Sequence, residues 1–89
     1  MTVAKAEKEF EKAKNNPKGW HFEKLAALYE KYGFTIRSGK GSHFIASHPD
    51  IRTRASFPRH GELPEAYVKQ AVAMIEELLA LKGEKDESE

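Results

Sequence analysis

The sequence predicts a two-layer α+β domain in which helices cover one face of a three-stranded antiparallel sheet, in the order α-α-β-β-β-α. Apolar residues recur at helical spacing in two segments near the start and in one near the end, whereas the middle of the chain alternates apolar and polar residues as strands do. Glycine and proline separate these segments. With 89 residues, the chain is expected to form a single domain, residues 1–89.

A narrow apolar stripe predicts the first helix. It consists of Val3, Ala6, Phe10 and Ala13, and Asn15-Asn16-Pro17 ends it. Because short helices are marginal alone, we expect Phe10 to dock on the rest of the domain. Residues 1–15 are therefore expected to form an N-terminal helix. At the other end, residues 82–89 hold two lysines and four acids and are expected to form an acidic, frayed tail.

Two stronger amphipathic helices complete the helical layer. The earlier one follows Pro17-Lys18-Gly19, ends at Gly33 in a C-cap position, and has its apolar face at Phe22, Leu25, Ala26, Leu28, Tyr29 and Tyr32. The last helix begins near Pro64, which the first turn of a helix tolerates, and carries a broad apolar face from Tyr67 to Leu79. Trp20 and the tyrosines are assigned to packing.

Three strands are predicted between these helices: Phe34–Ser38, Ser42–His48 and Ile51–Phe57, separated by turns at Ser38–Gly41 and Pro49-Asp50. In the last strand, the residues expected to point inward are Ile51, Thr53, Ala55 and Phe57. Burial of Phe44 in the middle strand would turn His43 outward. If the registers agree, the open face of the sheet carries Arg37, His43, Arg52 and Arg54.

Composition narrows the possible chemistry. The chain has no cysteine, which excludes disulfides, thiolate zinc sites and cysteine nucleophiles. It has no apolar run near the length of a membrane span and no signal-peptide core, so we expect a cytoplasmic protein without a membrane partner. The net charge of +1 conceals a basic centre, because residues 31–60 hold six cations and one anion, Asp50. Such a centre is typical of proteins that bind phosphates.

His43 is the candidate catalytic residue. Imidazole titrates close to neutral pH, so it can take a proton from a hydroxyl or give one to a leaving oxygen. RNA supplies such a hydroxyl, the 2′-OH beside each phosphodiester. Cleavage of RNA through this hydroxyl requires neither a protein nucleophile nor a metal ion. The alternative is an exposed sheet histidine with local hydrogen bonds. Ser42 also has a structural alternative, because a serine after a glycine often merely closes a turn through its hydroxyl. The Gly-x-Ser-x-Gly elbow of serine hydrolases is absent from the sequence.

The candidate phosphate contacts are the basic residues in the same stretch: Arg37, Lys40, Arg52, Arg54 and Arg59, joined by His60 as the first candidate for a second proton-transfer group. A solvated strand face is the alternative, although ordinary surfaces intersperse both signs of charge. A metal cluster of His43, His48, Asp50 and His60 matches no ligand signature, and alternation places His43 and His48 on opposite faces. No metal or cofactor is therefore expected.

The order of these motifs resembles the HicA family, also called YcfA-like proteins. The resemblance covers about residues 15–80 and rests on an early Asn-Pro, a helix ending in Gly33-Phe34, Gly41-Ser42-His43 after it, a strand closing in His-Pro, and Phe-Pro-Arg-His before the last helix. It implies a double-stranded-RNA-binding-domain-like fold and a type II toxin that acts as an mRNA interferase through His43. Gly41 and Ser42 would form the motif's turn, and a HicB antitoxin would occlude the active face. Family members are often shorter at the N-terminus, so the resemblance assigns no role to the first helix.

Three hypotheses follow. The first is a metal-independent endoribonuclease toxin with RNA and a HicB-like antitoxin as partners. The second is a non-catalytic, double-stranded-RNA-binding-like module that uses the same basic face to grip structured RNA by its shape and phosphates. The third is a protein-interaction domain whose exposed sheet edge pairs with a partner strand.

Overall fold

The computed structural model describes residues 5–87, with side chains described for residues 7–81. Its elements are α1 (Lys5–Asn15), α2 (Phe22–Lys31), β1 (Thr35–Ser38), β2 (His43–Ser47), β3 (Ala55–Pro58) and α3 (Glu65–Glu87). The predicted α+β class and the order α-α-β-β-β-α are confirmed, and they are consistent with a double-stranded-RNA-binding-domain-like fold. Val3 and the side chain of Ala6, expected on the first apolar stripe, lie outside the described part of the chain.

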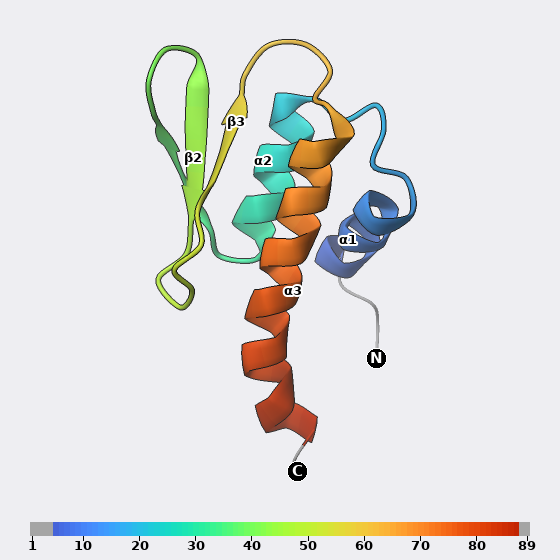
Figure 1. The fold of residues 1–89 in the computed structure, drawn as a ribbon. Helices are drawn as coiled ribbons and strands as arrows, with labels where there is room; N and C mark the ends of the chain where they lie inside the picture. The colour runs from blue at the N-terminus through green and yellow to red at the C-terminus, as the bar shows by residue number, and fades with distance from the viewer. Residues whose placement is uncertain (1–4, 88–89) are drawn as a thin grey trace.

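All three helices lie on one side of the sheet (Figure 1). The strands follow the order β1-β2-β3 and both pairs are antiparallel. Helices α2 and α3 lie between the sheet and α1, which packs on the side of the helices that faces away from the strands (Figure 1). The opposite face of the sheet carries no helix, and we call it the uncovered face.

The core lies between the sheet and the α2–α3 pair. Tyr29 of α2 and Phe57 of β3 are fully buried with ring centroids 5.5 Å apart, and the ring of Phe22 stacks on Phe57 at 5.4 Å. Helix α3 adds the buried side chains of Val68, Ala71, Met74, Ile75 and Leu78. Burying a large apolar side chain contributes about 1.5–3 kcal/mol, so these residues hold the helices on the sheet.

Helix α1 docks through Phe10, as expected. The Phe10 side chain is 6% exposed, and its ring meets that of Tyr32 edge-on at 5.9 Å. The ammonium of Lys14 lies 3.7 Å from a carboxylate oxygen of Glu76 on α3. Both contacts attach α1 to the helices rather than to the strands, so α1 leaves the uncovered face free.

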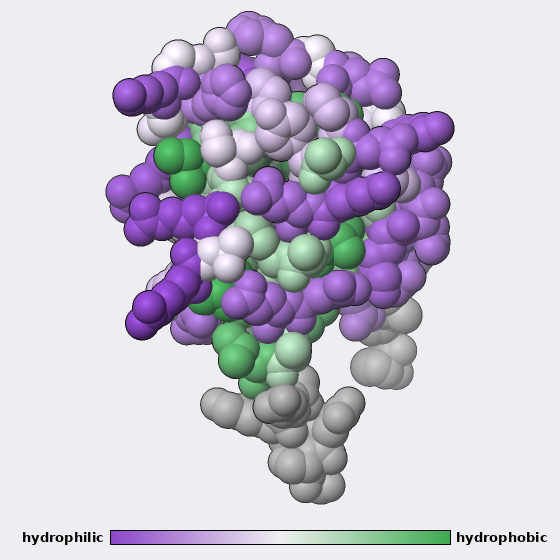
Figure 2. All heavy atoms as spheres, in the orientation of Figure 1, coloured by the Kyte–Doolittle hydropathy of each residue, from purple (hydrophilic) through white to green (hydrophobic). Residues whose placement is uncertain are grey.

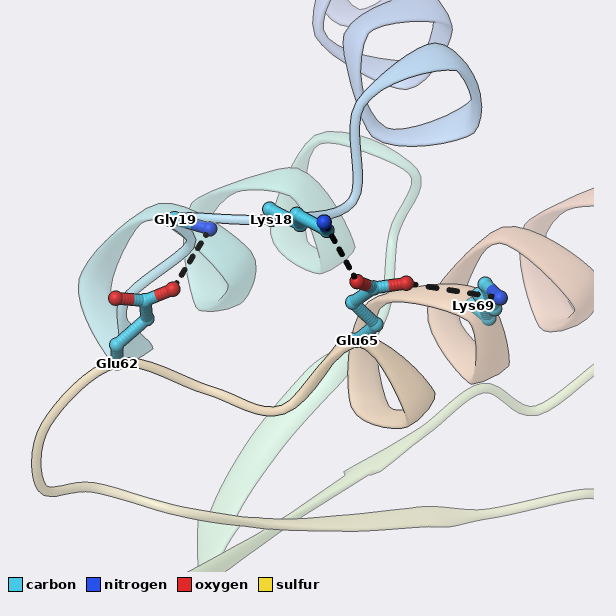
Figure 3. A network of polar contacts seen from close by, with 5 residues as sticks. All are labelled: Lys18, Gly19, Glu62, Glu65 and Lys69. Carbon is cyan, nitrogen blue, oxygen red and sulfur yellow. Dashed lines mark hydrogen bonds and ion pairs between the residues drawn. The ribbon is translucent and has the colours of Figure 1, made fainter.

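The segments before α2 and before α3 are joined to each other. The main-chain N–H of Leu63 donates to the carbonyl of Trp20 at 2.7 Å, and the N–H of Gly19 donates to the Glu62 carboxylate at 3.1 Å. Lys18 lies 3.7 Å from Glu65 at the start of α3 (Figure 3). These contacts fix the beginnings of α2 and α3 side by side.

The prediction for the third strand is wrong at its start, because β3 begins at Ala55 and not at Ile51. Ala46 pairs with Ala55, so Ser47, the last residue of β2, stands opposite residue 54, and residues 51–53 run past the end of the partner strand. Ile51 is nevertheless buried. Thr53, expected to point inward, is exposed, and its hydroxyl donates to the Glu77 carboxylate at 3.3 Å.

Helix α3 extends to Glu87 and thereby includes most of the segment expected to form an acidic tail. Residues 88–89 of that segment lie outside the described residues. Leu79 and Leu81, near the end of the region with described side chains, are 36% and 48% exposed. No helix in the described part of the chain is long and apolar enough to cross a membrane.

Candidate active site

The turn between β1 and β2 places the Gly41-Ser42-His43 motif. The main-chain N–H of His43 donates to the carbonyl of Lys40 at 3.0 Å, and the N–H of Gly39 donates to the carbonyl of His43 at 2.8 Å. Gly41 has φ +60°, and among the described residues only glycines have a positive φ. A positive φ at the first central position alone is the signature of a type II′ turn, which requires glycine there. Gly41 therefore sets the direction in which the chain enters β2.

A second backbone contact braces this turn. The N–H of Arg59 donates to the carbonyl of Ser42 at 3.0 Å, and His43 pairs with Pro58 in the sheet. The turn is thus held from both sides, by its own hydrogen bonds and by the segment that follows β3. This bracing fixes the backbone of His43, as a positioned proton-transfer group requires.

His43 lies on the uncovered face and is exposed. Its neighbour in the strand, Phe44, points to the helices, where its ring lies 4.8 Å from that of Phe22. Successive side chains of a strand point to opposite faces, so the packing of the half-buried Phe44 against the helices turns His43 outward, as predicted. Its ring is therefore open to a large substrate such as a nucleic acid.

Three arginines gather farther along the same face. Arg37 pairs with Ile45, which lies on the same face as His43 because the two are separated by one residue in β2. Arg37, Arg52 and Arg54 line one pocket together with the hydroxyl-bearing residues Thr35 and Ser47. Among the described side chains, the ion pairs involve lysines and His48 and no arginine. The arginines are thus available to an external anion.

Arg59 lies elsewhere. Its guanidinium stands over the rings of Phe22 and Phe44, 5.7 and 5.9 Å from their centroids, on the helix side of the sheet. Lys40 is exposed in the β1–β2 turn, and His60 is exposed in the segment after β3. The basic residues identified from the sequence therefore form two groups: Arg37, Arg52 and Arg54 on the uncovered face, and Lys40, Arg59 and His60 near the turn that carries His43.

His48 has a structural role. It is 8% exposed, its ring packs edge-on against Phe34 at 5.1 Å, and its Nδ1 accepts a hydrogen bond from the N–H of Asp50 at 3.0 Å. It points to the helix side, opposite to His43, as the alternation predicted. Among the described residues, no group of three or more His, Asp or Glu side chains is arranged to hold a metal ion.

Sequence reasoning missed two features of this region. Thr35 and Ser47, which face each other across β1 and β2, contribute hydroxyls beside the arginines. Phe22 and Phe44 support the guanidinium of Arg59. The first was visible as a polar residue two positions before Arg37 on a strand. The second depends on how α2 packs on the sheet, which no local pattern reveals.

Comparison with known proteins identifies a family. A family model described as HicA toxin of bacterial toxin-antitoxin matches residues 22–78. The match runs from the start of α2 into α3, and it includes His43 and all four arginines, whereas α1 precedes it. Searches of curated proteins and of solved structures gave no match.

Proposed function

Because the chain belongs to the HicA toxin family of bacterial toxin–antitoxin systems, we propose that it is an endoribonuclease, an mRNA interferase whose catalytic residue is His43. The observation that carries this proposal is the placement of His43. It is exposed on the uncovered face, at the end of a turn fixed by main-chain hydrogen bonds, with Lys40 in the same turn. The inference of ribonuclease chemistry comes from the family resemblance and from the ability of histidine to transfer protons near neutral pH.

In the proposed reaction the 2′-oxygen of RNA attacks the adjacent phosphorus. His43 takes the proton of the 2′-OH as the new 2′-O–P bond forms, and the P–O5′ bond breaks. The leaving 5′-oxygen receives a proton, for which the exposed His60 is the first candidate donor, and the products carry a 2′,3′-cyclic phosphate and a 5′-hydroxyl. Lys40 and Arg59, the cations near the turn that carries His43, stabilise the negative charge on the phosphorus oxygens. No cofactor takes part in this scheme.

A toxin of this family implies an antitoxin partner. We propose a HicB-like protein that covers the uncovered face, because occluding His43 and the arginines would block both catalysis and RNA binding. Both partners and the mRNA would then meet in the cytoplasm.

The test is expression in bacteria with and without the histidine. Wild-type protein should arrest growth and shorten bulk mRNA, whereas His43→Ala should do neither and still fold, because the side chain is exposed. His21→Ala is the matched control, since His21 is also exposed and makes no side-chain capping hydrogen bond. Equal toxicity of wild type and His43→Ala would remove His43 from the mechanism.

A non-catalytic RNA-binding module is the alternative function, and the concentration of arginines away from His43 is the observation that favours it. It predicts that purified wild-type protein binds RNA and leaves it intact. Recovery of full-length RNA after long incubation at saturating protein would support this alternative over the nuclease.

A further inference from the structure

The arginine pocket has the composition of a binding site for a phosphate. It has a volume of about 550 Å³ and is lined by the polar residues Thr35, Arg37, Ser47, Arg52 and Arg54, while His48, Pro49 and Ile51 complete its wall. A smaller hollow of about 340 Å³ shares Arg37, Ser47 and Arg54 with it. No acidic residue lines either space. Guanidinium groups bind phosphate oxygens through paired, charge-assisted hydrogen bonds, and hydroxyls add further donors.

The sheet itself builds this pocket. Thr35 pairs with Ser47, which places both hydroxyl-bearing residues on the uncovered face, and Arg37 follows Thr35 on that face one pleat away. Since Ala46 pairs with Ala55, the chain brings Arg54 alongside Ser47. Strongly hydrophilic side chains project from the side of the molecule on which Figure 1 draws the strands (Figure 2).

The segment that carries Arg52 is anchored as well. Ile51, next to it, is 8% exposed, and its N–H donates to the carbonyl of His48 at 3.3 Å. The N–H of Asp50 donates to the ring of the same histidine, whose Nδ1 also lies 3.9 Å from the Asp50 carboxylate. The turn after β2 is thus tied to a buried histidine. This arrangement holds the backbone of Arg52 beside the pocket.

The pocket begins at Arg37, opposite Ile45 and two residues along β2 from His43, and extends past Ser47 to Arg54 and Arg52. Ser47 lies on the same face as His43 but four residues farther along β2. At about 3.4 Å per residue, this separation is about 14 Å. A phosphate between Arg37, Arg52 and Arg54 is therefore a different phosphate from the one beside His43.

We propose that this pocket is a phosphate subsite that binds a backbone phosphate of the RNA away from the scissile bond. This inference rests on the proposed function, because it takes RNA as the ligand. The subsite holds the strand while His43 and the turn residues act on another linkage. Loss of its arginines should therefore raise Kd and KM and leave kcat nearly unchanged, since the interaction is the same in the ground state and the transition state.

The decisive experiment maps phosphates one at a time. A short RNA that the wild type cleaves is bound to full-length His43→Ala protein, and each phosphate is replaced in turn by a neutral methylphosphonate. We expect one position away from the scissile linkage at which affinity falls about tenfold or more, because hydrogen bonds to charged groups are lost. In Arg37→Gln and Arg54→Gln proteins that position should no longer matter, whereas the effects at the other positions should persist.

Two further variants sharpen the measurement. Arg37→Lys retains the charge but not the paired hydrogen bonds, so it should recover only part of the affinity. Lys69→Gln removes one exposed cation from α3, where Lys69 pairs with Glu65, and should leave the phosphate map unchanged. All of the arginines concerned are exposed, so these variants are expected to fold.

The outcomes separate this inference from the proposed function. Suppose that the wild type cleaves RNA but that each methylphosphonate has the same effect whether or not Arg37 or Arg54 is replaced. That result would overturn the subsite and leave the proposed nuclease activity intact. A fall in kcat in the arginine variants with an unchanged KM would also overturn it, since the arginines would then act at the scissile phosphate. If the protein neither binds nor cuts RNA, both the subsite and the proposed function are wrong.

Discussion

The space where Gly33 would carry a side chain is occupied by His48: a Cβ built on Gly33 would lie 3.1 Å from Nε2 of His48. Gly33 follows α2 with φ +89°, a left-handed conformation that ends helices and that favours glycine. The histidine cannot move away easily, because its ring packs on Phe34 and its Nδ1 accepts the Asp50 N–H. The end of α2 and the turn after β2 therefore depend on each other.

Gly33→Ala should reduce the free energy of unfolding by about 2–3 kcal/mol, through backbone strain and displacement of the His48 ring. Gly19→Ala is the matched control, since Gly19 has φ +77° but a Cβ there would meet nothing within 4 Å. Gly19→Ala should lose only about 1–2 kcal/mol of unfolding free energy, because alanine is strained in the left-handed backbone conformation. Equilibrium urea unfolding followed by circular dichroism measures both. Equal losses in the two variants would show that the His48 contact adds nothing.

The buried hydroxyl of Tyr29 predicts a loss of stability at alkaline pH. Burial raises the pKa of this phenol well above its usual value, and the hydroxyl has one polar contact, the sulfur of Met74 at 3.9 Å. The neutral form is favoured in the folded state, so the stabilisation is complete below the unfolded pKa of about 10 and declines as pH rises toward the folded pKa. Burial likewise raises the pKa of Tyr32, to which the carboxylates of Glu7 and Glu11 add.

We therefore expect the free energy of unfolding of the wild type to fall between about pH 9 and pH 11, and that of Tyr29→Phe to fall less. The two proteins should differ little at neutral pH, where the phenol is neutral in both states. Both proteins contain the same lysines, which titrate in the same pH range. The difference between their unfolding free energies therefore cancels the contribution of the lysines. Identical alkaline slopes would mean that Tyr29 does not ionise on unfolding.

Cleavage should require the 2′-OH of the RNA. A single 2′-O-methyl group at the scissile nucleotide should abolish cleavage there and leave binding nearly intact, because the modification removes the proposed nucleophile alone. DNA of the same sequence should not be cut, and EDTA should leave the rate unchanged. Product ends analysed by mass spectrometry should be 2′,3′-cyclic phosphate and 5′-hydroxyl. A 5′-phosphate product would instead indicate attack by water or a metal-bound hydroxide.

Local sequence patterns correctly predicted the helices and strands whose buried side chains recur at a regular spacing. The apolar spacing around Tyr29 and the glycine at position 33 were sufficient for α2, and alternation around Phe44 was sufficient to turn His43 outward. Alternation failed for residues 51–53, because a strand also needs a partner and β2 ends at Ser47. Strand alternation reports which side chains are buried and cannot report where the neighbouring strand stops.

The candidate site was predictable in its residues and less so in its arrangement. The turn motif identified His43, and the charge balance identified the arginines. The separation of Arg59 from the other arginines depends on Phe22, which reaches Phe44 only when α2 packs on the sheet. The pocket between Arg37 and Arg54 depends on pairing across all three strands. Both are tertiary features, and single-segment patterns carry no information on them.

The position of Trp20 gives the protein an internal fluorescent reporter. Trp20 is the single tryptophan in the chain, is 3% exposed, and donates its indole N–H to the carbonyl of Asn16 at 3.0 Å. It belongs to the segment that joins α1 to α2, and Figure 1 shows that this segment runs on the helix side of the sheet. Its emission therefore reports on the packing of the helices. The arginine pocket lies on the other side of the sheet. Unfolding can thus be followed by tryptophan emission while RNA is present, without an added label on the protein.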